Sequence, residues 1–170
     1  MAYKINDLTE DVVKDFRWLQ MCVVGASVMR KCSKAQYFSY VLDDLGRVRG
    51  CGYNGTPSGL KDCVDGGCPR AKKDVPAGTP YNFGDGLCLS NHAEMNALIG
   101  IDRAVLFSAT LFVNGVCCFG CAKEICGAGI KRVVGIDRPD IRSDHSLTEQ
   151  IFDDCGVDWV LFDWRLFENT

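Results

Sequence analysis

The chain has little histidine, no excess of positive charge and no long apolar segment. Of its 170 residues only two are histidine, and 19 Lys and Arg stand against 22 Asp and Glu, for a formal charge of -3. Duplex nucleic acid is bound through a basic face that replaces phosphate counterions, so this balance argues against a nucleic-acid partner. No run of about 18 apolar residues occurs and the start is mixed polar, so neither a membrane span nor a signal peptide is expected. We predict a cytoplasmic protein, with small nucleotides still allowed as ligands.

Repeats, low-complexity tails and linker-like stretches are also missing. The composition, 47% hydrophobic and 24% charged, suits one globular domain with a full core. We therefore expect a single domain over residues 1–170.

Cysteine, in contrast, is abundant, with eleven in the chain. A secreted disulfide framework is one interpretation. However, the number of cysteines is odd, no export signal is present, and the core is large enough to be stable without disulfides. These points favour metal ligands and buried thiols in a reducing compartment.

The first half of the chain predicts a helix followed by a hairpin. Apolar residues recur at helical spacing from about Leu8 to Arg30, with Thr9 as the N-cap. Two β-like runs, Tyr37 to Leu42 and Arg47 to Tyr53, are separated by a turn that ends in glycine, which predicts antiparallel strands. Residues 54–90 then lose periodicity, and so long an irregular segment is usually functional.

The second half alternates helices and strands. The expected elements are a helix beginning near His92, a strand Thr110 to Asn114, a helix beginning near Cys118, a strand Arg132 to Ile136, a helix near Ser146 to Asp154 and a strand Val157 to Phe162. Strands separated by helices pair in parallel through right-handed crossovers. The sequence therefore predicts an α/β fold with a mixed sheet and helices on both of its faces.

Two short motifs predict a metal site. His92-Ala93-Glu94 is followed by Cys118-Phe119-Gly120-Cys121, which gives one imidazole and two thiolates, the three protein ligands of a catalytic zinc. Glu94 lies two residues after His92, so its carboxylate can reach a water in the fourth position and act as the catalytic acid and base. An H-x-E motif with a distant C-x-x-C is the signature of zinc-dependent nucleobase deaminases.

Less specific interpretations of the same residues stay open. Cys118 and Cys121 could form a redox pair, His92 could be a buried structural residue, and Glu94 could be a solvated carboxylate. Cys117 offers a second register for the thiolate pair with Cys121. We favour Cys118 with Cys121, because residues three apart share a helical face and a helix N-terminus lowers thiol pKa values.

With these motifs and others, the chain resembles the deoxycytidylate (dCMP) deaminase family of the cytidine deaminase superfamily. The matching segments, in order, are Cys32 to Gln36, Gly52 to Gly59, His92 to Ala97, Cys118 to Lys123 and Ala128 to Val134. The resemblance implies a three-layer α/β/α sandwich around a five-stranded mixed sheet, one catalytic zinc per subunit, and conversion of dCMP to dUMP with release of ammonia.

The resemblance also implies contacts to nucleotides. Asn54, with Gly55 and Asn96, is expected to bind substrate or effector, although an Asn-Gly turn is a purely structural alternative for Asn54. Candidates for the phosphate are the cationic Lys34, Arg138 and Arg142, each of which could instead be a solvated loop charge. Members of the family are commonly hexamers, activated by dCTP with magnesium and inhibited by dTTP, so we expect a homo-oligomer with such effectors.

A second, structural zinc is suggested by Cys63, Cys68 and Cys88, because some relatives hold one at a similar cluster. Four ligands are usual for such a site, and Cys51 or Asp65 could be the fourth. Unligated buried thiols are the alternative.

Three positions depart from the family pattern. Cys117 stands where a proline is usual before the C-x-x-C, Asn114 stands where a small residue is usual, and Phe38-Ser39 replaces Gly-Ala. A 5-substituted dCMP or another cytosine nucleotide is therefore an alternative substrate. A nucleic-acid editing deaminase is expected to carry a basic recognition surface, which is missing. A catalytically silent nucleotide sensor is not expected to keep His92 and Glu94.

Overall fold

The computed structural model describes residues 9–73, 75–76, 79, 81, 84, 87–138 and 145–168. In chain order its elements are α1 (Glu10–Val28), β1 (Phe38–Leu42), β2 (Val48–Tyr53), a π-helical turn η1 (Cys63–Gly67), α2 (Pro69–Lys72), α3 (Ala93–Leu98), α4 (Arg103–Leu106), β3 (Thr110–Val113), α5 (Phe119–Ala128), β4 (Arg132–Asp137), α6 (Ser146–Cys155), β5 (Asp158–Asp163) and a 3-10 turn η2 (Trp164–Phe167). No helix among these residues is long and apolar enough to cross a bilayer.

The five strands form one mixed sheet in the order β2-β1-β3-β4-β5. β1 is antiparallel to both β2 and β3, whereas β3, β4 and β5 run parallel to one another. The turn between β1 and β2 ends at Gly46, whose positive φ of 74° suits glycine. The predicted leading hairpin and parallel second half are both confirmed.

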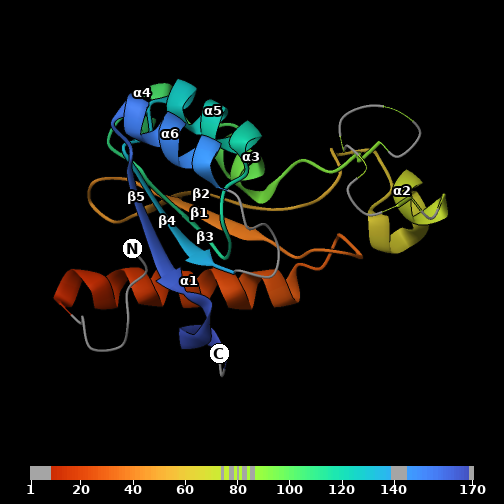
Figure 1. Ribbon diagram of the computed structural model, residues 1–170, viewed down its shortest axis with the longest axis horizontal. Helices are drawn as coiled ribbons and strands as arrows, with labels where there is room; N and C mark the ends of the chain where they lie inside the picture. Colours follow the sequence, from red (N-terminus) through yellow and green to blue (C-terminus); the bar gives the residue numbers. More distant parts are fainter. Residues whose placement is uncertain are drawn as a thin grey trace.

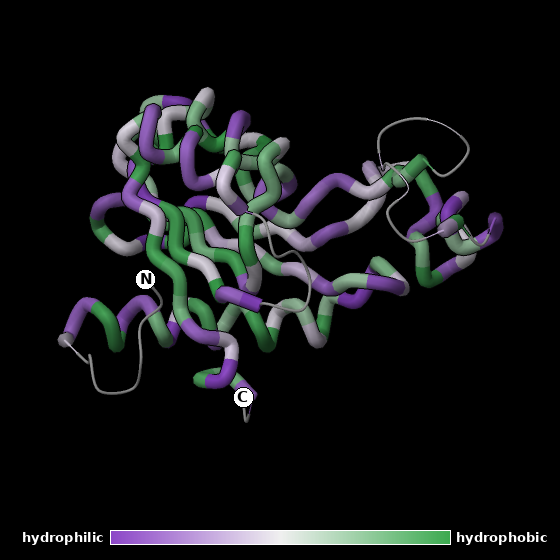
Figure 2. Tube along the Cα trace, viewed as in Figure 1, coloured by the Kyte–Doolittle hydropathy of each residue, from purple (hydrophilic) through white to green (hydrophobic). Residues whose placement is uncertain are grey.

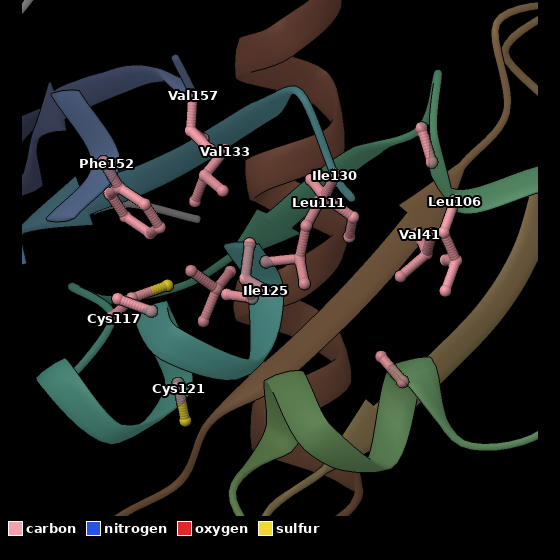
Figure 3. Close-up of a cluster of buried hydrophobic side chains, with 14 residues drawn as sticks. Val41, Leu106, Leu111, Cys117, Cys121, Ile125, Ile130, Val133, Phe152 and Val157 are labelled. Carbon is pink, nitrogen blue, oxygen red and sulfur yellow. The ribbon is translucent and has the colours of Figure 1, made fainter. Parts of the chain in front are cut away.

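Helices cover the two faces of this sheet. Figure 1 shows α1 crossing one face, with α3, α4, α5 and α6 on the other. The hydrophobic colouring of Figure 2 concentrates in the strands between these layers. The core on the α5 side, drawn in Figure 3, packs Val41, Leu111 and Val133 of the strands against Ile125 of α5 and Phe152 of α6. The predicted three-layer sandwich is confirmed.

α1 is fixed to the sheet by a cap and an ion pair. The Thr9 hydroxyl accepts a hydrogen bond from the Val12 N–H at 3.4 Å, which confirms the predicted N-cap. Asp15, which is buried, accepts two hydrogen bonds from the Arg132 guanidinium, at 3.0 and 2.7 Å. Because Arg132 begins β4 and also bonds Asp158 at 3.0 Å, one side chain links α1 to two strands.

The sequence predicted an irregular segment over residues 54–90, but the structure differs from this prediction. The segment contains η1 and α2, and Figure 1 shows the region of α2 projecting away from the sheet. The short helices α4 and η2 were also not predicted. All four span only four or five residues, too few for an amphipathic period to show in sequence.

Glycines of β2 bring α3 against the sheet. A Cβ on Gly50 would lie 2.3 Å from the Ala97 carbonyl oxygen, and a Cβ on Gly52 would lie 2.3 Å from the Ala97 nitrogen and 2.4 Å from the Ala93 oxygen. Gly50 and Gly52 are two residues apart and lie on the same face of β2, so the backbone of α3 packs directly against that of β2.

Candidate metal and catalytic site

Three side chains from two helix starts converge at one point. His92 is the N-cap residue of α3 and Cys118 is the N-cap residue of α5, whose first turn holds Cys121. The His92 Nδ1 atom lies 3.4 Å from the Cys118 sulfur and 3.3 Å from the Cys121 sulfur. Within the described ranges this is the one group of three or more metal-ligand side chains whose donor atoms lie within 4.8 Å of one another.

This donor set fits a tetrahedral zinc ion. With ordinary Zn–S and Zn–N bond lengths of about 2.3 and 2.0–2.1 Å, tetrahedral ligand atoms lie about 3.6 Å apart, close to the spacing between His92 and each sulfur. A hydrogen bond from the Cys121 thiol lowers the pKa of Cys118 to about 3, whereas the same hydrogen bond and burial raise the pKa of Cys121. Metal binding to both sulfurs requires both as thiolates, so it releases the proton held by Cys121.

The structure separates Cys117 from these donors. Its side chain is buried in the core (Figure 3), and burial raises the pKa of its thiol well above the usual value. The Thr148 hydroxyl donates to the Cys117 carbonyl at 3.3 Å, which fixes the backbone just before Cys118. This geometry favours the register with Cys118 and Cys121.

Glu94 lies in the first turn of α3, next to the three donors. Its side chain is 5% exposed, and burial raises the pKa of its carboxyl, with the Cys117 thiol as a hydrogen-bond partner. A buried carboxyl with a raised pKa binds and releases a proton more readily near neutral pH than a solvated one. The arrangement can therefore supply a metal ion and a proton carrier side by side.

His92, Glu94 and Cys118 face a pocket of about 140 Å³ that extends toward the segment around α2. Among the described residues that line it are one carboxylate, Glu94, and three basic residues, Lys34, Arg70 and Arg138. In a chain with a formal charge of -3, this local balance favours an anionic ligand.

The predicted nucleotide-contacting amides are engaged with the chain itself. Asn54 lines the pocket, but its Oδ1 accepts from the Tyr37 N–H at 2.8 Å and its Nδ2 donates to the Ala35 carbonyl at 2.6 Å. The Asn96 Nδ2 donates to the Tyr53 carbonyl at 2.8 Å, and Gly55 forms an isolated antiparallel bridge with Asn91. These bonds shape the pocket wall.

Two of the three predicted phosphate cations, Lys34 and Arg138, line the pocket. Arg138 follows β4 directly, and its Nε atom is buried with no hydrogen-bond partner in the described part of the chain. The third candidate, Arg142, lies outside the described residues.

Cys63, Cys68 and Cys88 line the same pocket, together with Cys32, which the sequence had not associated with them. The Cys63 sulfur lies 3.5 Å from the Ser90 hydroxyl, and burial raises the pKa of Cys63 to about 11. The two fourth ligands suggested from sequence, Cys51 and Asp65, are both exposed and not among the lining residues.

Sequence reasoning also missed Arg70, Tyr81 and His145 in the lining. The Arg70 side chain is buried, donates to the Thr79 carbonyl at 3.1 Å and lies 4.2 Å from the centre of the Tyr81 ring. No local pattern marks such residues, because only the tertiary fold brings them to the pocket.

Known proteins share both motifs and fold with this chain. A family model described as the cytidine and deoxycytidylate deaminase zinc-binding region matches residues 13–136. A deoxycytidylate deaminase of Mycobacterium phage D29 is 41% identical over 111 residues, which are 65% of this chain and 84% of the phage protein. The chain belongs to the cytidine and deoxycytidylate deaminase family. Membership confirms the predicted class of enzyme, a zinc-dependent hydrolase.

Other known proteins match this chain to different extents. The deoxycytidylate deaminase of Saccharomyces cerevisiae is 39% identical over 122 residues, or 71% of this chain but only 36% of the yeast protein. Among solved structures, the dCMP deaminase of cyanophage S-TIM5, in complex with dCMP and dUMP, has a TM-score of 0.58 at 20% identity and covers 91% of this chain and 99% of its own. Acinetobacter baumannii RibD also reaches 0.58, at 19% identity, with 88% of this chain and 35% of RibD covered. These likenesses show the shared fold.

Proposed function

We propose that the protein catalyses the hydrolytic deamination of dCMP to dUMP with release of ammonia. The observation that carries the proposal is the cluster of His92, Cys118 and Cys121 beside the buried Glu94, in a pocket whose described lining also holds Lys34, Arg70 and Arg138. A base that loses its amino group to water matches the metal donors and Glu94, and a sugar phosphate that brings negative charge matches the basic residues of the lining. The phage and yeast relatives named above are deoxycytidylate deaminases.

In this proposal His92, Cys118 and Cys121 hold one zinc ion. When bound, the ion supplies Lewis acidity that lowers the pKa of a water toward neutrality, so that hydroxide is available for attack at C4 of the cytosine. Glu94 takes the proton of the attacking water and delivers it to N3 of the ring, then moves a proton to the departing amino group. Its burial excludes solvent that would compete for the proton.

Arg138 is the proposed main contact to the substrate phosphate, with Lys34 in a supporting position. An arginine Nε that is buried without a partner carries an unmet hydrogen-bonding capacity, and a phosphate oxygen in the pocket supplies the acceptor. Arg138→Gln is therefore expected to lower kcat/KM for dCMP by about 10-fold to 100-fold, since hydrogen bonds to charged groups contribute about 1.5–3 kcal/mol. Deamination of deoxycytidine, which has no phosphate, should change little.

The direct test is ammonia release from dCMP, CMP, dCTP, deoxycytidine and 5-methyl-dCMP, with zinc measured on the same sample. The proposal expects dCMP to give the highest kcat/KM. A clear preference for 5-methyl-dCMP would assign the alternative substrate that the departures at Cys117 and Asn114 leave open. A matched control for the arginine variant is Arg47→Gln, because Arg47 is exposed in the turn between β1 and β2.

Control by dCTP with magnesium and by dTTP, and assembly into a homo-oligomer such as a hexamer, remain further parts of the proposal. Their support is the position of Asn54 and Gly55, which follow β2 and lead into the segment that carries η1 and α2. A triphosphate bound there can change activity if it binds two arrangements of that segment with different affinity.

A second, structural zinc at Cys63, Cys68 and Cys88 is also proposed, with Cys32 as the fourth thiol. The support is that all four cysteines are among the residues that line the pocket. Zinc content near two ions per chain, falling to one in Cys68→Ser, would agree with this site. One ion per chain in the unaltered protein would exclude it.

A further inference from the structure

The catalytic proposal does not involve two cysteines that lie toward the C-terminal ends of α5 and α6. Cys126 lies in the second half of α5 and is partly buried, whereas Cys155 is the last residue of α6 and is exposed. The two helices pack against each other, and Figure 1 shows them side by side. Both cysteines are free thiols.

The Cys126 thiol points at the turn of α6 that ends in Cys155. Its sulfur lies 3.7 Å from the carbonyl oxygen of Ile151, to which it donates. In an α-helix the carbonyl of residue 151 accepts a hydrogen bond from the N–H of residue 155. The Cys126 thiol and the Cys155 backbone N–H therefore both lie next to the Ile151 carbonyl oxygen. The nearby Cys155 thiol also contributes to the raised pKa of Cys126, after burial. Because Cys155 lies one helical turn after Ile151, the two thiols are neighbours across the contact between α5 and α6, as a disulfide between them requires.

We propose that Cys126 and Cys155 are an oxidisable pair that forms a disulfide between α5 and α6 when the protein meets a low-molecular-weight disulfide such as oxidised glutathione.

The exposed Cys155 is the attacking residue. Its thiolate displaces one glutathione thiolate from oxidised glutathione and leaves a mixed disulfide on Cys155. Cys126 then loses its proton to solvent and attacks the Cys155 sulfur, and the second glutathione leaves. In total the two protein thiols give up two electrons and two protons, and one small disulfide becomes two thiols. Burial raises the pKa of Cys126 to about 12, which makes it the slower nucleophile and gives it the resolving role.

The disulfide would fasten the part of α5 that lies away from the metal donors. Cys118 and Cys121 lie at the start of α5. The disulfide would join the opposite end of this helix to α6 and would not involve either residue. The disulfide would close the loop from residue 126 to residue 155. Such a link stabilises a protein mainly by restricting its unfolded state. We therefore expect oxidation to raise the thermal midpoint by about 5 °C or more, with kcat/KM nearly unchanged.

Peptide mapping of the zinc-loaded full chain tests the proposal. After treatment with oxidised glutathione and alkylation of the remaining thiols, trypsin isolates Cys126 in peptide 124–131 and Cys155 in peptide 143–165, and neither peptide holds another cysteine. The expected result is one linked species containing both peptides from the same chain. The rise in thermal midpoint should reverse with a reducing agent, disappear in Cys155→Ser and persist in Cys51→Ser, a control at another exposed cysteine.

Recovery of both peptides in fully alkylated form would overturn the proposal, as would a link from either peptide to a different cysteine or to a second chain. The mapping uses the unaltered protein, so a folding defect in Cys155→Ser would not obscure the answer. A linked pair without any rise in thermal midpoint would overturn the assigned effect of the bond.

Discussion

Gly52→Ala is expected to displace α3, the helix that carries Glu94, by a clash with its backbone. Gly52 lies in β2, and a Cβ there would lie 2.3 Å from the Ala97 nitrogen and 2.4 Å from the Ala93 oxygen. Both contacts are backbone atoms of α3, so no side-chain rotation can relieve them. α3 must move away from the sheet, and it carries Glu94 in its first turn and His92 as its N-cap.

The size of this movement follows from the contact distances. Ordinary contacts begin at 3.4 Å, so a contact of 2.3 Å requires α3 to shift by about 1 Å. Overpacking of this kind costs about 1–3 kcal/mol of stability. A displacement of about 1 Å at catalytic groups can cost about 100-fold in rate. We therefore expect Gly52→Ala to lose activity more than it loses stability.

Steady-state deamination of dCMP, zinc content and urea denaturation measure these effects together. The matched control is Gly127→Ala, the same substitution in α5 at a position where no described atom outside the helix's own nearby backbone lies within 4 Å of the added Cβ. The control should keep full activity and be slightly more stable, because alanine favours a helix by about 1 kcal/mol over glycine. Wild-type kcat in Gly52→Ala would refute the reasoning that β2 positions α3.

Three further perturbations follow from the structure. Cys118→Ser should reduce catalytic zinc occupancy, whereas Cys117→Ser should not; loss of the metal only in the second variant would reverse our choice of register. At subsaturating dCMP, dCTP with magnesium should raise and dTTP should lower the rate, and Asn54→Ala should weaken both responses; rates indifferent to both triphosphates would leave an unregulated enzyme. Asp15→Asn should lower the free energy of unfolding by about 2 kcal/mol, since Asp15 accepts two hydrogen bonds from Arg132, and an unchanged urea midpoint would argue against that role.

The elements with strong periodicity were predictable from sequence. Thr9 and the apolar spacing after it define α1, and the alternation of strands and helices after residue 110 defines the parallel half of the sheet. The grouping of His92, Cys118 and Cys121 was also accessible, because the short motifs at His92 and Cys118 each fix their local geometry at a helix start. In these cases the information lies within a few residues of the feature it specifies.

What could not be predicted depends on contacts between distant segments. Cys32, which precedes β1, and Arg70, which lies in α2, line the same pocket although they are far apart in the chain. The Asn54 amide was expected to meet a nucleotide, yet both of its ends bond the backbone before β1, a pairing that needs the register of β1 and β2. Gly52 was visible as part of a motif, but its reason, the close approach of α3, needs the packing between the two elements.

The central claim is that Glu94 moves protons for deamination at a zinc ion held by His92, Cys118 and Cys121. Its most direct test is the conversion of dCMP to dUMP by the unaltered protein and by Glu94→Gln, each with measured zinc content. The account predicts equal zinc in both proteins, stoichiometric dUMP and ammonia from the first, and a rate lower by about 100-fold or more in the second. Equal rates in the two zinc-loaded proteins, or no dUMP from the unaltered one, would contradict it.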